Sequence, residues 1–538
     1  MSDSSGITPA APAYANDKHA SDKGSAHKVA VGEVDHTVHL ERRFGFWSCL
    51  GMAFIMLNSW TDGSADHPTA MAAALGVVLP SGGAVSVVWG CLTSAFGAMM
   101  TVLSLAEVCH IYPTTGGQYD WTYMIAPKSM KKSLSYLVAW SACAGWVTLT
   151  ATASAFCGTF VTTIVALWHP EFEMKNYQTF LIYILFPIGA FCLNTFGVRI
   201  LPAVERSGFY WGISGIVVVS IVCLATASPE FRPAKDVFTE FTNVTGWPDG
   251  MAFLIGLLQS TVGLSGYDAI THMMEEMPTP SRYAPRVMIM AVALGAVTSW
   301  FFLVILLFCI KDIDAVIAAP AGPLLEIYYQ ATNSRAGSTC LVMFNFLAMV
   351  YATQGIMTIA SRMVFTFSRD HGFGRLSPLL APVHPKLMVP VWCLVFVCVA
   401  DCVLGFIYLG SSIAFNAIAA SSMFFLQLSY IIPISIVLVR GESIFEGQPR
   451  RWSLGRFRRL INVCSLIFLI TTSVIFLFPP ALPVDGATMN YVSVVIGVVG
   501  LMSAVVWLMD GRRHFVGPTE LAERLEVGRR SSEDVGAS

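Results

Sequence analysis

An ionisable residue, Asp268, stands inside an apolar stretch of the chain, directly after two glycines and a serine. The stretch begins with Met251-Ala-Phe-Leu-Ile-Gly-Leu-Leu258 and continues through Gly263-Leu-Ser-Gly-Tyr-Asp268. A carboxylate at this position could bind an ammonium group, relay a proton, or cap a helix that begins there. The two glycines favour a break in the helix, and secondary transporters build substrate sites at such breaks.

The depth of this break in a membrane follows from helix geometry. From Met251 to Leu264 a helix rises about 20 Å, which is less than the roughly 30 Å of the hydrocarbon core. Unpaired backbone at that depth is tolerated only where it lines a cavity. The alternative is a glycine kink with Asp268 as the N-cap of the second half-helix. The predicted substrate-binding residues here are Gly263, Ser265, Gly266, Tyr267 and Asp268.

A second polar interruption occurs near the start of the chain. The apolar run Phe46 to Leu57 is followed at a similar depth by Asn58, Ser59 and Trp60. Polar side chains beside a tryptophan in a membrane core predict a second unwound wall of the same site, so these three residues are also predicted to bind substrate. The two interrupted segments are the first and the sixth, a spacing that fits two inverted five-helix repeats.

Composition places the chain in the class of all-α polytopic membrane proteins. Of its 538 residues, 55% are hydrophobic and only 12% are charged. There is no basic patch for nucleic acid, and the thirteen cysteines show neither a disulfide framework nor metal-binding spacing. No HExxH motif, catalytic carboxylate pair or nucleophile–histidine arrangement is present. We therefore expect no enzyme activity, no catalytic residue, no metal and no cofactor.

About twelve apolar segments are long enough to span a bilayer. Their expected limits are 46–79, 84–109, 134–167, 178–196, 208–227, 250–272, 287–310, 337–361, 388–408, 411–438, 460–478 and 488–509. The predicted organisation is a disordered N-terminal tail (1–43), a transporter domain (44–510) and a C-terminal tail (511–538). Within the domain we expect repeat one at about 44–227, repeat two at about 250–438, and two appended helices at about 460–509.

Basic residues lie mainly in alternate loops between these segments, and the richest cluster is Arg440 to Arg459. By the positive-inside rule these loops are cytosolic, and an even number of spans then places both termini in the cytosol. The expected location is the plasma membrane, with a vacuolar or other internal membrane as the alternative.

Several motifs between residues 44 and about 440 resemble the amino acid–polyamine–organocation (APC) transporters. The nearest branch is the fungal amino acid/choline transporter family, which includes GABA, choline and amino-acid permeases. The motifs are Leu57-Asn-Ser-Trp-Thr61, Leu79-Pro-Ser-Gly-Gly83, Ser104-Leu-Ala-Glu-Val-Cys-His-Ile-Tyr-Pro-Thr-Thr-Gly-Gly-Gln-Tyr119, Gly266-Tyr-Asp-Ala269, Glu275-Glu-Met-Pro278, Ile359-Ala-Ser-Arg-Met363 and Phe367-Ser-Arg-Asp370.

The resemblance implies a LeuT-like five-plus-five inverted repeat, with substrate held at the breaks of helices one and six. It also implies a permease, usually proton-coupled, that imports a small amine-bearing solute such as an amino acid, GABA or choline. Protons and the lipid bilayer are then the other partners. The alternative is a transporter-like nutrient sensor with little or no flux.

One segment departs from the pattern of the resembling family. The pattern runs from Asn58–Thr61 almost directly into an alanine-rich half-helix, here Ala70–Gly76, whereas this chain interposes Asp62–Thr69. Two carboxylates and an imidazole near mid-membrane are costly unless they face water. Either the insert enlarges the unwound region or it is an accident in an otherwise family-like helix.

Four further polar features carry expectations. Glu107 is expected to pair with a nearby arginine, with an inner-gate role as the alternative, and Asp401 to face a helix contact. His272 and Glu275 are expected on a solvated cytosolic helix end. The glycines and proline of Pro113–Tyr119 favour a tight re-entrant turn at an inner gate.

Overall fold

The computed structural model describes residues 44–57, 75, 78–172, 174–319, 321–410, 412–445, 452–486, 489–515, 517–518 and 525. The predicted site residues Asn58, Ser59 and Trp60, and the insert Asp62–Thr69, lie outside the described residues. Within the described ranges the chain is helical apart from its connections and one isolated β-bridge between Ser81 and Asn243.

The helices follow one another along the chain with short connections. Those of the first half are α1 (Phe46–Leu57), α3 (Gly83–Ile111), α4 (Gln118–Ile125), α5 (Lys131–Trp168), α6 (Asn176–Phe196), α7 (Leu201–Ala227), α8 (Ala234–Thr239), α9 (Asp249–Gly263) and the 3-10 helix η1 (Ala269–Glu276). Next come α10 (Pro280–Cys309), α11 (Ile313–Ala318), α12 (Pro323–Thr332), α13 (Arg335–Arg369), η2 (Gly374–Leu376), α14 (Ser377–Leu380), α15 (Val391–Gly410) and α16 (Ser412–Arg440). The chain closes with η3 (Gly441–Phe445), η4 (Gly455–Phe457), α17 (Arg458–Ile475), α18 (Val492–Val506), the π-helical η5 (Trp507–Gly511) and α19 (Arg512–His514).

Within the described residues, nine helices are long and apolar enough to cross a membrane. The shorter helices α1, α9 and α15 fall on the three remaining segments that the sequence predicts to span. The twelve predicted spans are therefore all represented by helices. The sixth span is broken, because α9 ends at Gly263 and non-helical residues follow it within the membrane-spanning segment. Helix α1 is described as far as Leu57, so the predicted break of the first span lies outside the described residues.

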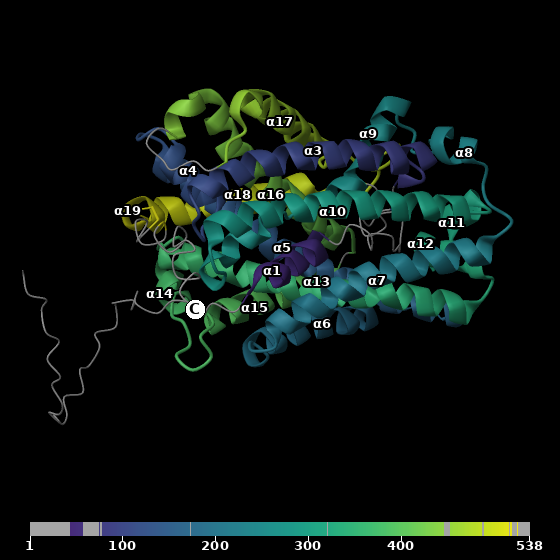
Figure 1. The fold of residues 1–538 in the computed structure, drawn as a ribbon. Helices are drawn as coiled ribbons and strands as arrows, with labels where there is room; N and C mark the ends of the chain where they lie inside the picture. Colours follow the sequence, from purple (N-terminus) through teal and green to yellow (C-terminus); the bar gives the residue numbers. More distant parts are fainter. Residues whose placement is uncertain are drawn as a thin grey trace, which may run out of the picture.

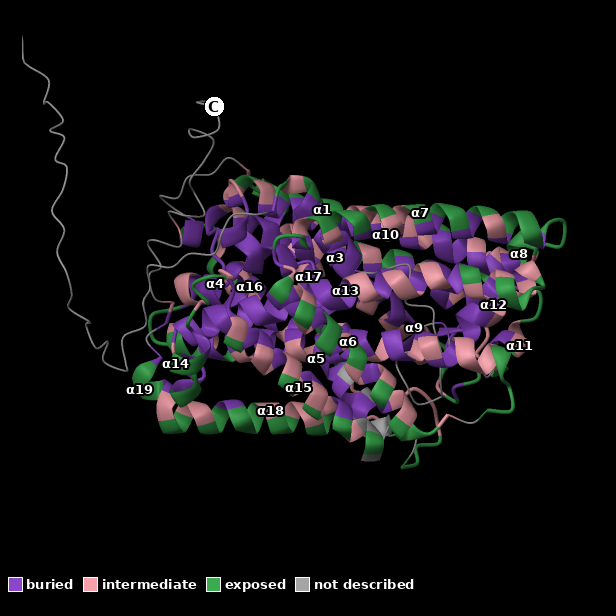
Figure 2. Ribbon diagram, turned by 90° about the horizontal axis from the view of Figure 1, so that it is seen from below, coloured by how far each residue is buried: buried purple, intermediate pink, exposed green. Residues whose placement is uncertain are grey.

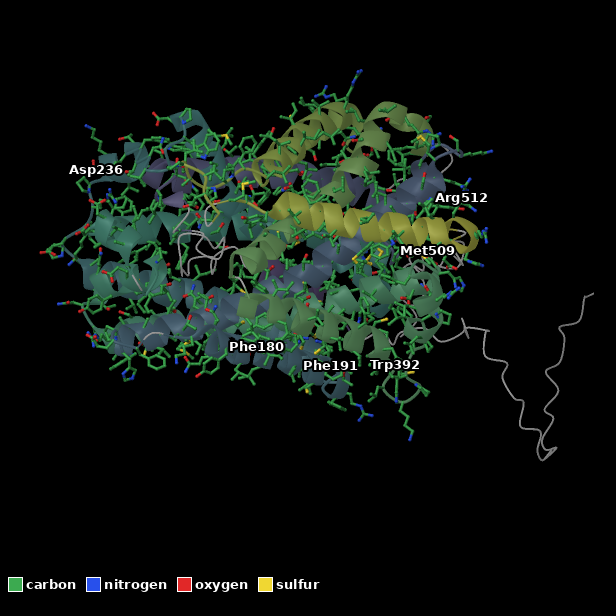
Figure 3. The ribbon with its side chains drawn as sticks, turned by 180° about the vertical axis from the view of Figure 1, so that it is seen from behind. Phe180, Phe191, Asp236, Trp392, Met509 and Arg512 are labelled. Carbon is green, nitrogen blue, oxygen red and sulfur yellow. The ribbon has the colours of Figure 1, made fainter. Side chains whose placement is uncertain are left out.

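The outer surface of the bundle is apolar, as a lipid-facing surface must be. Figure 2 shows α18 lying along one edge of the bundle with exposed residues over much of its length. The span Val492–His514, which begins with α18, has only 11% of its most apolar part buried. Trp392 and Met509, labelled in Figure 3, are 51% and 75% exposed. So much exposed apolar surface would be unfavourable in water, but it is stable in contact with lipid tails.

The helix contacts pair the first predicted repeat with the second. The second span packs against the seventh (α3 with α10), the third against the eighth (α5 with α13), and the fourth against the ninth (α6 with α15). Each contact joins a helix of repeat one to the helix five positions later in repeat two. This is the pairing expected of a five-plus-five inverted repeat, and it confirms the predicted fold class.

The short helices gather at the two ends of the bundle. In Figure 1, α4, α14 and α19 lie at one end, and α8 and α11 lie at the other. We call these the α4 end and the α8 end. Arg512 and Asp236, labelled in Figure 3, mark the α4 end and the α8 end respectively.

Candidate substrate site

The sixth span breaks where its glycines predicted. Helix α9 ends at Gly263, and η1 begins at Ala269, with non-helical backbone between them. Gly266 adopts φ +88°, a left-handed conformation that glycine reaches without steric cost. Ser265 turns its hydroxyl back to the carbonyl oxygen of Thr261 at 2.6 Å, which satisfies one acceptor freed by the break. Tyr267 and Asp268 complete the connection.

Asp268 is fully buried at this break and accepts hydrogen bonds from three other elements. The Tyr430 hydroxyl of α16 lies 2.5 Å from Oδ1. Gln118 Nε2, on the first residue of α4, lies 2.6 Å from Oδ2, and the Trp146 indole nitrogen of α5 lies 3.3 Å from Oδ2. The carboxylate therefore joins η1, α4, α5 and α16 at one point.

The capping hypothesis for Asp268 is wrong. Asp268 does occupy the N-cap position of η1, but its side chain makes no capping hydrogen bond. Its backbone carbonyl accepts from the Thr271 amide at 2.8 Å and from the Thr271 hydroxyl at 2.7 Å, whereas no backbone amide of η1 donates to its carboxylate. Stronger side-chain donors from neighbouring helices hold the carboxylate away from the helix end.

His272 is buried beside this carboxylate, which corrects the expectation of a solvated helix end. It is 2% exposed, its Nε2 lies 3.3 Å from Asp268 Oδ2, and its Nδ1 lies 3.2 Å from the carbonyl oxygen of Thr115. Its ring also meets the edge of Trp146 at 6.2 Å between centroids. The segment before α4, which contains Thr115, contacts His272 and helps to bury it, whereas the sequence pattern predicts exposure to water.

Aromatic rings surround the carboxylate. Tyr267 and Tyr430 lie with their ring centroids 5.1 Å apart, and both are buried. Trp146 contributes a third ring, and a Cβ atom placed on Gly266 would lie 3.5 Å from its Cη2 atom. A carboxylate among aromatic faces favours an organic cation, because both the charge and the ring quadrupoles attract it.

Buried ion pairs join η1 to α13. Arg369 Nη2 donates to Glu275 Oε1 at 2.9 Å, and the hydroxyl of Thr115 donates to the same oxygen at 3.1 Å. Arg362 Nε donates to Glu276 Oε1 at 2.9 Å. Glu275 is only 8% exposed, so its predicted solvation is also wrong. The motif that contains Thr115 contacts one of these ion pairs, and its role at an inner gate stays a prediction.

Two other membrane carboxylates have no hydrogen-bond partner among the described residues. Glu205 on α7 is 1% exposed, and a Cβ atom on Gly355 of α13 would lie 3.4 Å from its Oε1. Its own backbone lies against Gly51 of α1. Asp401 on α15 is buried, and its backbone carbonyl oxygen accepts a hydrogen bond from the hydroxyl of Tyr183 of α6, so the residue lies at a helix contact as expected.

A small buried cavity lies near the break, and a larger open hollow lies on the α8 end. A cavity of about 10 Å³ beside Gly263 is lined by Gln259 and Ser260, and it is large enough for a single water molecule. A shallow hollow of about 610 Å³ on the α8 end contains Glu230 and Lys311. Their 2.9 Å hydrogen bond lowers the pKa of the Glu230 carboxyl.

The comparisons with known proteins agree with this architecture. The sequence profile of the amino acid permease family matches residues 44–501. A choline transporter of Saccharomyces cerevisiae is 34% identical over 90% of this chain and 84% of its own length. An amino-acid permease of Arabidopsis thaliana is 26% identical over 91% of this chain and 96% of its own.

Solved structures share the fold at low sequence identity. A crystal structure of a mutant Eremococcus coleocola manganese transporter superposes with a TM-score of 0.53 over 89% of this chain and 94% of that chain. The two sequences are 11% identical, so this likeness concerns the fold alone.

Proposed function

This chain belongs to the amino acid permease family of the APC superfamily, and from that premise we propose that it imports a small amine-bearing solute coupled to protons. It is a multi-pass membrane transporter and not an enzyme. The observation that carries the substrate proposal is the buried Asp268 carboxylate at the helix break, with Trp146, Tyr267 and Tyr430 around it.

Choline is the solute that this cluster suits best. A quaternary ammonium has no N–H donors, so it is recognised by a negative charge and by aromatic faces. The C-terminal end of α9 adds the negative end of a helix dipole at the same place. The similarity to a yeast choline transporter supports this choice. An amino acid or GABA would additionally need a partner for its own carboxylate, such as the amides of a half-helix N-terminus.

Uptake measurements test the substrate. Cells lacking endogenous uptake should accumulate radiolabelled choline saturably when they express the protein, with unlabelled choline competing better than GABA or any member of an amino-acid panel. The panel is repeated at two external pH values, and uptake should rise at the lower one. Saturable amino-acid uptake that choline does not inhibit would overturn the choice of choline. No flux of any solute from a correctly trafficked protein would favour the nutrient-sensor alternative.

We further propose that the α4 end faces the cytosol, that both termini lie there, and that the protein acts at the plasma membrane or, alternatively, at a vacuolar or other internal membrane. The excess of arginine in the loops of this end supports the orientation. An epitope placed after Ser538 should then be reached by antibody only after the plasma membrane is permeabilised.

Glu205 is the proposed carrier of the coupled proton. An unpaired carboxylate anion inside a membrane protein costs several kcal/mol, so this side chain is held as a neutral acid or must gain a cation. Its position on α7 next to α1 and α13 places it where helices of the two predicted repeats meet. A proton taken up there can respond to movement of α1.

The change Glu205→Gln should abolish concentrative, pH-dependent uptake while leaving exchange of labelled for unlabelled substrate across the membrane. The amide mimics the neutral acid and cannot release a proton. Asp401→Asn is the matched control, because it removes another buried carboxylate that lacks a described partner but lies on α15 against α6. If the Glu205 variant still accumulates substrate with the normal pH profile, the proton is carried elsewhere.

A further inference from the structure

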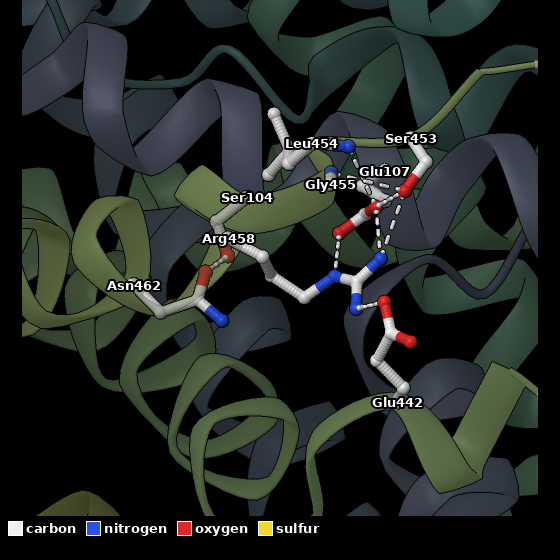
Figure 4. A network of polar contacts seen from close by, with 8 residues as sticks. All are labelled: Ser104, Glu107, Glu442, Ser453, Leu454, Gly455, Arg458 and Asn462. Carbon is white, nitrogen blue, oxygen red and sulfur yellow. Dashed lines mark hydrogen bonds and ion pairs between the residues drawn. The ribbon is translucent and has the colours of Figure 1, made fainter.

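A network of polar contacts at the α4 end joins three separate elements around Arg458, as Figure 4 shows. Arg458, the first residue of α17, donates through Nε to Glu107 Oε2 at 2.7 Å and through Nη2 to Glu107 Oε1 at 2.8 Å. Its Nη1 donates to Glu442 of η3 at 2.8 Å. The expected pairing of Glu107 with an arginine is thus confirmed.

Ser453 completes this network from the connection that precedes α17. Its hydroxyl donates to Glu107 Oε1 at 2.9 Å and accepts from Arg458 Nη2 at 2.9 Å. The next amide, of Leu454, donates to the same Glu107 oxygen at 2.9 Å. Glu107 and Arg458 are buried, whereas Ser453 is exposed and lies outside any helix.

The network joins helices that belong to different parts of the transporter. Glu107 lies four residues before the end of α3, which packs against α9 and α10. Glu442 follows α16, which packs against α5. Alternating access in this class of fold moves one group of helices against the other. A contact that holds α3 to the connection between α16 and α17 therefore resists that movement at the α4 end.

The sequence around Ser453 has the form of a kinase substrate. Arg450 and Arg451 stand three and two positions before the serine, in Arg450-Arg451-Trp452-Ser453. Guanidinium groups at these positions suit the acidic substrate groove of a basophilic serine/threonine kinase, through paired charge-assisted hydrogen bonds. We propose that Ser453 is a phosphorylation site and that its modification releases the network of Glu107 and Arg458.

The chemistry of the step accounts for the release. The kinase transfers the γ-phosphoryl group of Mg·ATP to Ser453 Oγ: an O–P bond to serine forms, the bond to ADP breaks, and the hydroxyl proton passes to the kinase's base. The hydroxyl can then no longer donate to Glu107. A phosphate of charge about −1.5 to −2 now lies beside two carboxylates that share one guanidinium. Repulsion, and competition for Arg458, separate the connection from α3.

Labelling of the purified full-length protein tests the site. The catalytic subunit of cAMP-dependent protein kinase with radiolabelled ATP should phosphorylate Ser453, as located by mass spectrometry. Ser532, in Arg529-Arg530-Ser531-Ser532, has the same spacing, so all labelling is done in a Ser532→Ala background. Adding Ser453→Ala should remove the remaining label, whereas Ser443→Ala, an exposed serine of the same connection, should not. Persistence of the label in the Ser453 variant would overturn the site.

Hydrogen exchange tests the release independently of any substrate. The amide of Leu454 is held by Glu107, so phosphorylation should accelerate exchange in a peptide covering residues 452–457 at least about tenfold, as expected for a protected amide that becomes open. The Ser453→Ala protein treated with kinase keeps the Arg458–Glu107 pair and should show no acceleration. Equal exchange in the phosphorylated and untreated proteins would overturn the switch.

The functional consequence is measured after reconstitution into liposomes. Phosphorylated protein should show a KM for external substrate at least about fivefold higher, because loosening the α4 end lowers the fraction of molecules open to the other side. Protein with Ser453→Ala should have the same KM with and without kinase treatment. An unchanged KM with confirmed phosphorylation would show that the modification does not regulate transport. The labelling and exchange results stand even if choline proves not to be the substrate.

Discussion

Replacing Asp268 with asparagine is expected to weaken the apparent affinity for substrate by roughly 10- to 150-fold, or to abolish the pH dependence of uptake. The range corresponds to the loss of a charge-assisted contact, which is worth about 1.5–3 kcal/mol. The substitution would also change the hydrogen bonds that the side chain of residue 268 accepts. Gln118 and Trp146 donate to Oδ2 and Tyr430 donates to Oδ1, so asparagine can keep these contacts only with its oxygen toward Gln118 and Trp146 and with the Tyr430 hydroxyl turned to accept from its NH2 group.

Two measurements separate the roles that remain once capping is excluded. If Asp268 binds the substrate ammonium, the Asn variant should raise KM for exchange and for net uptake alike. If it relays the coupled proton, exchange should persist while accumulation and its pH dependence are lost. Asp401→Asn makes the same change elsewhere in the membrane and should leave KM near its normal value. Normal affinity, accumulation and pH profile in the Asp268 variant would show that the carboxylate only holds the helices together.

The features that could be predicted from the sequence depend on local physics. Segment lengths follow from the thickness of the hydrocarbon core, and the helices fall on the predicted spans. The break of the sixth span follows from Gly266, because glycine adopts the positive φ that the turn requires. Glu107 was predicted to pair with arginine because a carboxylate near a membrane boundary needs a partner, although the sequence did not identify Arg458.

The errors arise where a distant segment changes the environment. His272 and Glu275 follow the apolar part of their span and precede Pro278, a pattern typical of a helix end in water. The re-entrant segment before α4 buries both, with Thr115 bonding each of them. Capping by Asp268 was plausible from its position alone, but donors from three other elements take its oxygens instead.

Tyr430 illustrates a contact that no local pattern could indicate. It lies in a long apolar helix, 162 residues from the carboxylate that it contacts. A single tyrosine in such a helix is more often an interhelical contact than a site residue. Only the packing of α16 against α5 and α4 brings its hydroxyl to Asp268. Gln118 belongs to the motif Pro113–Tyr119, but that motif predicts a turn and gives no sign that Gln118 donates a hydrogen bond to Asp268.

Replacing Gly266 with leucine is expected to reduce uptake to background while the protein still inserts into the membrane. At φ +88° a residue with a Cβ atom is strained by about 1–2 kcal/mol. The Cβ itself would have ordinary contact with Trp146 at 3.5 Å, so the leucine branch beyond it would extend into the aromatic cluster. The variant therefore both strains the break and fills the space beside Asp268.

Two matched variants separate these effects from a general loss of folding. Gly266→Ala carries the backbone strain without the branch, so it should retain partial uptake. Gly250→Leu places the same side chain at the start of α9, where an added Cβ meets nothing within 4 Å, and should transport normally. Surface expression is measured alongside uptake for all three proteins. Near-normal uptake by Gly266→Leu at equal surface expression would mean that the break is only a kink, and that substrate binds elsewhere in the bundle.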